Sequence, residues 1–331
     1  MSKELAPAEG LDLGVLPACQ WVVQQATSVH LDEARLVQLA QDWVQSPWQV
    51  PNWDWEIHWR GSPGDTIHYV LLLDALNFCF WADPGQPRWR VHHRGRWWNG
   101  YKGLAVALGR ALDEGVPLTD ATYLAGCSLQ DLAQVLRGEV EIPLLEQRWQ
   151  HAQQVGRVLL DRFEGDFSRA IAACDGSARR LTRLIADEFS CFFDVSSYRG
   201  RQVPLYKRAQ ITVVDLAGSL EFQGLGAFDD LDHLTAFADY KIPQVLRALG
   251  VLSYAPPLAE RVDAQLELAP GCEEEVEIRA AMVWAVERIR LEMAARGRCL
   301  KAYEVDWFLW NLGQSPLPDE RPYHRTRTVF Y

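Results

Sequence analysis

Residues 226–254 read GAFDDLDHLTAFADYKIPQVLRALGVLSY, and this stretch decides the class of fold that we expect. Asp232 stands in the N-cap position before the apolar segment HLTAFA, which predicts a short helix. A sharp turn follows, and a second helix has Pro243 in its first turn and Gly250 near its end. The stretch therefore predicts two short helices joined by a tight turn.

The rest of the chain is also predicted to be mainly helical. Apolar residues recur at three- and four-residue spacing over 32–45, 101–114 and 143–164. Thr119 and Ser128 are typical N-caps and predict two further short helices. Other helices are expected over 166–174, 176–187, 206–221, 229–237, 242–251, 256–265, 273–296 and 301–312.

Strand signals are few. IHYVLLL (67–73) is a candidate strand, and QITVVDL (210–216) is ambiguous between strand and helix. PRWRVHHRGRWWNG (87–100) alternates basic and apolar residues around Arg94-Gly95, which predicts a hairpin. We therefore expect a mainly α protein with one small β element in the first third of the chain.

The segment 195–205 interrupts the predicted helices and is a candidate boundary. It divides the chain into an N-terminal helical part with the hairpin, 1–200, and a C-terminal helical part, 201–331. No stretch has the composition of a linker, so we expect the two parts to pack as one compact body.

Composition excludes several classes of protein. Hydrophobic residues make up 48% of the 331 positions, enough for a large core. No apolar run approaches the 18 residues of a membrane span, and residues 1–14 lack the pattern of a signal peptide. Seven cysteines without CxxC spacing indicate reduced thiols and a cytoplasmic location. Motifs for metals and nucleoside triphosphates are lacking, so we expect no metal and no cofactor.

The net charge of −11 bears on the partner. Proteins that bind polynucleotides through phosphates usually carry a basic footprint, which this chain lacks. A small molecule is therefore the expected partner, with neither a polynucleotide nor a membrane. The 14 tryptophans fit either an apolar core or flat faces that stack on a planar ligand, and composition favours the core.

A single aspartate stands inside the aromatic segment EVDWFLWNLG (304–313). On a helix, Asp306 shares a face with two aromatic rings, and burial raises the pKa of such a carboxyl unless a cation or donor stabilises its charge. Two interpretations follow. Asp306 is either a buried partner of an arginine such as Arg279 or Arg288, or a catalytic carboxylate in an aromatic pocket.

Two other groups of charged residues stand out. Asp229 and Asp230 follow Phe228 directly and, unlike a capping residue, have no evident local role. Lys207 and Arg208 lie at the start of a predicted helix, where two cations can hold a phosphate with the help of the helix dipole. A solvated surface is the alternative for this second pair.

Several ungapped motifs, in the same order along the chain, resemble the queuosine salvage protein family. They are LDALNFCFWA (73–82), YKRAQI (206–211), FADYKIPQVLRALGVL (237–252), EVEIRAA (275–281), VDWFLW (305–310) and YHRTRTVFY (323–331). Members of this family are queuosine 5′-monophosphate N-glycosylases that release the base queuine. The resemblance implies an all-α fold similar to helix-hairpin-helix DNA glycosylases, without their role in binding DNA.

The resemblance also implies roles for single residues. Asp306 matches the catalytic aspartate of the family. Phe228 and Asp230 match positions that hold the base, and Asp230 is a candidate partner for the secondary ammonium of queuine. Asp229 and Trp307 are expected beside them, with Phe228 or Trp307 stacking on the base.

The remaining expected contacts are less specific. Asn311 lies where some members carry an aspartate, and we expect it at the base. Lys241 replaces an arginine of other members, which keeps the charge and loses the bidentate fork. We expect Lys207, Arg208, Tyr240 and Lys241 near the phosphate and ribose, on the basis of charge and position.

The sequence thus predicts a hydrolase that cleaves the N-glycosidic bond of queuosine 5′-monophosphate to release queuine for salvage. Two alternatives stay open. One is a DNA or RNA base glycosylase of the helix-hairpin-helix type, and the other is a non-catalytic helical binding protein.

Overall fold

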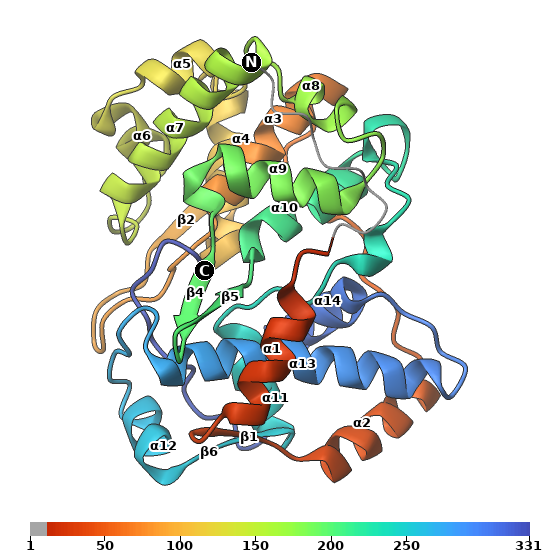
Figure 1. Cartoon of the computed structure of the whole chain (residues 1–331). Helices are drawn as coiled ribbons and strands as arrows, with labels where there is room; N and C mark the ends of the chain where they lie inside the picture. The colour runs from red at the N-terminus through yellow and green to blue at the C-terminus, as the bar shows by residue number, and fades with distance from the viewer. Residues whose placement is uncertain (1–11) are drawn as a thin grey trace.

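The computed structural model describes residues 12–331, and helices dominate it (Figure 1). The prediction of a mainly helical protein is therefore confirmed. Three small two-stranded antiparallel sheets accompany the helices in these residues. Most of the segment on which the signal-peptide expectation rests lies outside the described residues.

One group of helices forms the upper part of the molecule in Figure 1. It comprises α3 (Pro63–Ala75), α4 (Gly100–Asp113), α5 (Ala121–Gly126), α6 (Leu129–Val135), α7 (Leu145–Phe163), α8 (Phe167–Ala172), α9 (Ala178–Glu188) and α10 (Lys207–Ser219). α10 packs against α3 and α9, and α5 packs against α7. Because α10 is buried along nearly its whole length, its first residue is held inside the molecule.

A second group forms the lower part (Figure 1). It comprises α1 (Val15–Gln25), α2 (Glu33–Gln45), α11 (Lys241–Ala248), α12 (Pro256–Asp263), α13 (Glu273–Ala294) and α14 (Ala302–Leu312). α13 packs against α1, α2, α11 and α14. Elements from both ends of the chain thus lie together, and the division at residue 200 stays a prediction.

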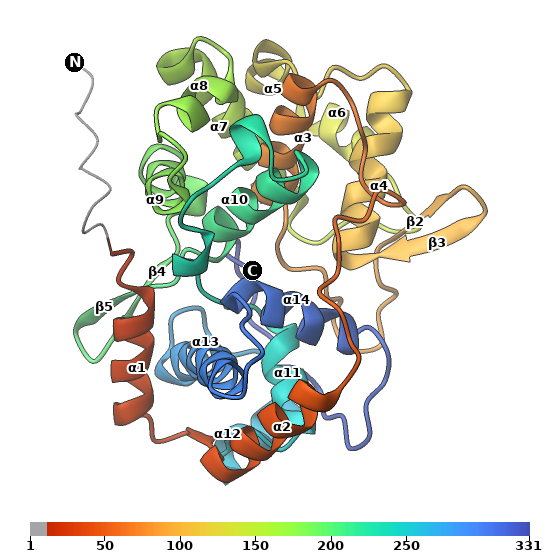
Figure 2. The ribbon, with the colours of Figure 1, turned by 90° about the vertical axis from the view of Figure 1, so that its right-hand side faces the viewer.

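The sheets are hairpins or pairings of distant segments. β2 (Arg90–His93) and β3 (Arg96–Asn99) form the predicted hairpin, which projects from the body in Figure 2. β4 (Val195–Tyr198) and β5 (Arg201–Pro204) form a second hairpin in the segment expected to be a boundary. β1 (Val29–Leu31) pairs with β6 (Leu252–Tyr254), so more than the one expected β element is present. Strands of three residues that pair across the chain leave no local signal.

The prediction of a strand at 67–73 is wrong, because this segment lies inside α3. Ser62 caps α3 by accepting a hydrogen bond from the Asp65 amide, and Pro63 occupies its first turn. Almost every residue of the helix after the first turn is buried. A helix buried on all sides shows no apolar periodicity, and its short apolar run resembles a strand.

The helix predicted over 229–237 is also wrong. Only a 3-10 turn, η3 (Leu231–His233), forms there, so Asp232 caps no α-helix. The backbone amide of Thr235 donates to the Gln210 side chain, and that of Phe237 donates to Asp306. These amides are committed to tertiary partners, so they cannot form helical hydrogen bonds. The predicted N-cap Thr119 is displaced by one residue, since Asp120 caps α5, whereas Ser128 caps α6 as predicted.

All seven cysteines have free thiols, and only Cys299 is exposed. Within residues 12–331, no helix is both long enough and apolar enough to cross a membrane.

Candidate active site

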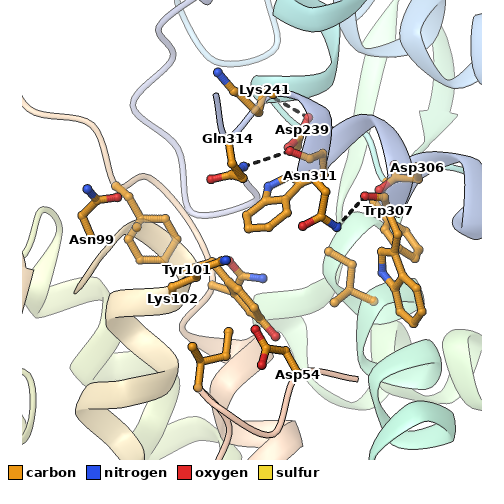
Figure 3. A pocket seen from close by; sticks show the side chains of 18 of the residues that line it. Asp54, Asn99, Tyr101, Lys102, Asp239, Lys241, Asp306, Trp307, Asn311 and Gln314 are labelled. Atoms are coloured by element: carbon orange, nitrogen blue, oxygen red, sulfur yellow. Dashed lines mark hydrogen bonds between the residues drawn. The ribbon is translucent and has the colours of Figure 1, made fainter. Parts of the chain in front are cut away.

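A cavity of about 890 Å³ opens between the two groups of helices. Its walls come from the loop 51–58, the segment 77–81, the end of β3 with the start of α4, one face of α10, residues 237–241 and the inner face of α14. Figure 3 shows how side chains from these segments point toward one space. Tyr323 and Tyr331 complete the wall near the C-terminus.

Asp306 lies on α14 and faces this cavity (Figure 3). The residue is only 3% exposed, and its Oδ2 accepts a hydrogen bond of 2.8 Å from the Phe237 amide. Burial raises the pKa of Asp306 well above its usual value, and the charge of Asp239 raises it further. The Phe237 amide and the charge of Lys207 oppose this rise. The carboxyl is thus held in a dry, acidic setting.

The arginine partner considered for Asp306 is wrong. Arg279 forms its ion pairs with Asp194 and Glu275, and Arg288 pairs with Glu33 on the surface. In the part of the chain that the structure describes, no arginine forms an ion pair with Asp306. A buried carboxyl without such a partner is costly for a purely structural residue.

Asp239 is a second carboxyl in the cavity, and it is not among the residues predicted to form the site. Its Oδ1 accepts hydrogen bonds from the amides of Lys241 at 3.0 Å and Ile242 at 2.9 Å, so it holds the start of α11. Burial raises the pKa of Asp239, while Lys207 and the two amides act in the opposite direction. The signal that could have found it is an aspartate just before a helix with Pro243 in its first turn.

Lys207 is the first residue of α10 and lines the same cavity. Its amide donates to Asp194 Oδ2 at 3.2 Å, which fixes the start of the helix. Burial lowers the pKa of Lys207 to about 8, although the charges of Asp239 and Asp74 raise it. Lys207 also lowers the pKa of Asp306. It is therefore a buried cation among carboxyl groups rather than a surface charge.

Four other predicted site residues line the cavity: Trp307, Asn311, Tyr240 and Lys241. Asn311 Nδ2 donates to the Trp307 carbonyl at 2.8 Å, which leaves its Oδ1 available. Lys241 Nζ donates to Gln244 at 2.8 Å. The structure thus brings these four together with Asp306 and Lys207.

Phe228, Asp229 and Asp230 do not line the cavity. Asp230 instead receives hydrogen bonds of 2.8 Å from the Ser177 hydroxyl and from Arg179 Nε, and one from the amide at the start of α9. Burial raises the pKa of Asp230, but these hydrogen bonds prevail and hold it below its usual value. Their assignment to the base stays a prediction that the cavity does not support.

Arg208 also lies outside the cavity walls. Its guanidinium is buried and donates to the backbone carbonyls of Asp74 at 3.0 Å, of Ala75 and of Cys191. Arg208 thus ties the end of α3 to the segment before β4. This position gives it a structural role, and its contact with phosphate stays a prediction.

The model of the queuosine salvage protein family matches residues 57–331. The chain belongs to this family. It is similar to the queuosine 5′-phosphate N-glycosylase/hydrolase of Sphaerobacter thermophilus, with 50% identity over 96% of this chain and 98% of the relative. Proteins of the same name from Mus musculus and Schizosaccharomyces pombe are 35% and 34% identical, over 86% and 78% of this chain and 88% and 78% of their own. The resemblance seen in the sequence is confirmed.

In this member of the queuosine salvage family, tryptophans serve both the core and the cavity. Trp89 is fully buried in the core. Seven tryptophans line the cavity: Trp53, Trp55, Trp81, Trp97, Trp98, Trp307 and Trp310. Composition favoured a core role, whereas the aromatic segment around Asp306 already pointed to Trp307 as part of a pocket. The tryptophans of the hairpin and of the loop 51–58 were not predicted, because these segments join the wall only through the tertiary fold. Over residues 12–331, no cluster of His, Cys, Asp and Glu suits a metal ion.

Proposed function

We propose that this chain is a hydrolase that cleaves the N-glycosidic bond of queuosine 5′-phosphate and releases queuine. The observation that carries this proposal is the pair Asp306 and Asp239, which face a tryptophan-lined cavity beside the buried cation Lys207. The named relatives, which match nearly the whole chain, support the choice of substrate.

The chemistry of the bond explains why carboxylates are needed. As the C1′–N9 bond breaks, positive charge develops on the ribose, and a nearby carboxylate stabilises it, as in glycoside hydrolysis. The stabilisation is stronger where water is excluded, as around Asp306. Queuine is a 7-deazaguanine and lacks the N7 that a purine can protonate, which increases the demand on this stabilisation.

The two aspartates have separate tasks in this proposal. Asp306, held by the Phe237 amide, stabilises the charge on the ribose. Asp239, whose second oxygen is free of the helix-capping bonds, accepts a proton from the attacking water. Lys207 favours the ionised form of both, because its charge lowers the pKa of each.

The ligand groups fit the remaining walls. We place the base against Trp307 and Asn311, and we place the 5′-phosphate at the rim, where Lys102 and Lys241 line the cavity. Tyr240 also lines the cavity, and we assign it to the ribose. Lys207 is surrounded by carboxyl groups, so we move it from the phosphate, where its sequence position suggested it, to the reacting centre.

The secondary ammonium of queuine requires a carboxylate. Asp54 lines the cavity and is only partly buried, unlike Asp306, Asp239 and Asp215. We assign the ammonium to Asp54 because Asp230, which the resemblance suggested, is occupied at the start of α9.

We also infer that the fold resembles that of helix-hairpin-helix glycosylases, with α11 in the place of the second helix and only the 3-10 turn η3 in the place of the first. A polynucleotide substrate is disfavoured by the net charge of −11. The basic hairpin gives little support for one, since Arg90 pairs with Glu139 and Arg96 with Glu56. A non-catalytic scaffold would leave the buried carboxyls of the cavity without a purpose. A cytoplasmic location remains part of this proposal.

The direct test is incubation of the purified protein with queuosine 5′-phosphate and detection of free queuine by mass spectrometry. A labelled DNA or RNA duplex, titrated at several salt concentrations, tests the polynucleotide alternative. Release of queuine with weak duplex binding supports the proposal. Tight, salt-dependent duplex binding without queuine release would replace it with a polynucleotide glycosylase.

A further inference from the structure

Three side chains in the cavity wall are joined in one chain of hydrogen bonds. His58 Nδ1 contacts the Asp54 carbonyl at 2.8 Å, and His58 Nε2 contacts the Tyr101 hydroxyl at 2.8 Å. The Tyr101 hydroxyl in turn lies 3.1 Å from Asp215 Oδ2. His58, Tyr101 and Asp215 all line the cavity and come from the loop 51–58, α4 and α10.

The hydrogens in this chain can be counted. The Asp54 carbonyl only accepts, so His58 Nδ1 carries a hydrogen. Tyr101 has a single hydrogen to give. If that hydrogen points to His58 Nε2, Asp215 must be a neutral acid that donates to the Tyr101 oxygen. If it points to Asp215, His58 must be doubly protonated. All three hydrogen bonds can form only when His58, Tyr101 and Asp215 together hold one extra proton. The reference is the state with a neutral His58, a neutral Tyr101 and an ionised Asp215.

The surroundings favour the state with the proton on Asp215. Burial lowers the pKa of His58 to about 4, and the Trp53 ring stacks on it at 3.7 Å. Burial also raises the pKa of Asp215 to about 7. A neutral histidine beside a neutral acid is therefore the resting state between about pH 4 and about pH 7.

Several charged groups face this chain. Asp54 and Lys102 act on His58, while Lys207 acts on Asp215, and Asp215 in turn acts on Asp74. Both carboxyl oxygens of Asp74 are buried without a hydrogen-bond partner in residues 12–331. Burial and Asp215 raise the pKa of Asp74. The charge of Lys207 acts on Asp215. Lys207 can therefore stabilise the Asp215 carboxylate that remains after Asp215 donates its proton.

We propose that Tyr101 is the catalytic acid of the reaction, with Asp215 as its proton source and His58 as the residue that orients its hydroxyl. This inference rests on the proposed function. The C1′–N9 bond breaks and its electron pair goes to the base. The Tyr101 hydroxyl turns its hydrogen from His58 Nε2 to N9 of the base. N9 takes this proton while the Tyr101 oxygen takes the proton of Asp215, which becomes a carboxylate beside Lys207.

The attacking water supplies the proton that replaces the one given to the base. The attacking water gives its hydroxyl to C1′ and its proton to Asp239. Return of that proton to Asp215 restores the resting enzyme, and Lys207 faces both carboxyls. The reaction consumes only water, and no other reactant is needed.

The decisive variants are Tyr101→Phe and Asp215→Asn, with Tyr123→Phe on α5, outside the cavity, as the matched control. For queuosine 5′-phosphate, kcat is expected to fall roughly 100-fold or more in Tyr101→Phe and Asp215→Asn, the usual scale of general acid catalysis. KM should change little, and so should the melting temperature at pH 5, where Asp215 holds its proton. The control should match the wild type.

A second substrate separates acid catalysis from a structural effect. 4-Nitrophenyl ribofuranoside 5-phosphate releases a stable anion that needs no proton. Its turnover in Tyr101→Phe should stay within about threefold of wild type, because no acid is required. In Asp306→Asn, the turnover of both substrates should be lost. Equal losses of both substrates in Tyr101→Phe, or queuosine 5′-phosphate turnover within about twofold of wild type, would overturn the relay.

The pH profile with queuosine 5′-phosphate gives a test that does not depend on the nitrophenyl substrate. In the wild type, kcat should fall above about pH 7 as Asp215 loses its proton. This fall should vanish in both variants, and an unchanged fall would reject the relay. If the wild type releases no queuine at all, the proposed function itself fails, an outcome distinct from an active wild type with fully active variants.

Discussion

Arg279 and Asp194 form a bidentate ion pair, with Nη1–Oδ1 at 3.0 Å and Nη2–Oδ2 at 2.6 Å. Both side chains are almost completely buried. Asp194 Oδ2 also receives the Lys207 amide, and Arg279 Nε donates to the Ala238 carbonyl, next to Asp239. One ion pair on α13 thus fixes two of the three charged groups at the reacting centre.

Arg279→Met should therefore destabilise the fold. Removing one partner leaves Asp194 buried and uncompensated, which typically costs about 3–5 kcal/mol of unfolding free energy. Urea unfolding at constant pH measures this loss. Arg288→Met is the matched control, because Arg288 pairs with Glu33 at the surface and should change stability by less than about 1 kcal/mol. Similar losses in both variants would contradict the anchoring role.

Asp306→Asn should keep the fold and lose turnover of queuosine 5′-phosphate by several orders of magnitude. The amide has nearly the same shape but cannot carry the charge that stabilises the ribose cation. Queuine release, followed by mass spectrometry, gives the rate, and the melting temperature reports the fold. Asp161→Asn, on the exposed face of α7, is the control for the chemical change. Turnover near that of the wild type in Asp306→Asn would remove Asp306 from the mechanism.

Lys207→Met should move the pH dependence of activity. The charge of Lys207 lowers the pKa of Asp306 and of Asp239, so its loss raises both. Activity requires ionised carboxylates, and its fall on the acid side should therefore begin at a higher pH than in the wild type. A kcat profile between pH 5 and pH 9 measures the shift. An acid limb at the wild-type position would show that Lys207 does not act on these carboxyls.

Lys102→Ala should discriminate between phosphorylated and unphosphorylated substrate. If the 5′-phosphate lies at the rim, this change should weaken binding of queuosine 5′-phosphate by about tenfold, the scale of an ion pair near 1.4 kcal/mol. Binding of queuosine itself should be unaffected. Lys207→Ala should weaken both ligands alike, because Lys207 faces carboxyl groups. A loss confined to the phosphorylated ligand in Lys207→Ala would return the phosphate to Lys207.

Asp215→Asn should make the protein more stable at alkaline pH relative to the wild type. The pKa of Asp215 is about 7 in the folded protein and 3.8 as the ordinary value. Between these values the folded state holds the proton that the unfolded state releases, so wild-type stability falls as the pH rises toward 7. From pH 5 to pH 8 this loss amounts to about 3 kcal/mol, and the variant should lack it. Urea unfolding of both proteins at the two pH values measures this difference. An equal decline in the wild type and in Asp215→Asn would contradict the raised pKa.

Local signals in the sequence determined much of this protein. Periodic apolar residues and caps gave α2, α4 and α13 close to their observed bounds. The isolated carboxylate in an aromatic helix pointed to Asp306, and the ordered motifs pointed to the family. These features depend on neighbouring residues in the chain, so they can be read without the fold.

Only the tertiary structure decided which side chains share the cavity. Tyr101, His58 and Asp215 come from three separate segments, and none carries a motif. The sequence favoured Asp230 over Asp54 as the partner of the queuine ammonium, yet the hydrogen bonds of Asp230 hold it at the start of α9. The segment before α11 does not form its predicted helix, because its amides donate hydrogen bonds to Gln210 and Asp306. Burial and long-range hydrogen bonds set the charge of these groups, and the order of residues in the chain does not encode either one locally.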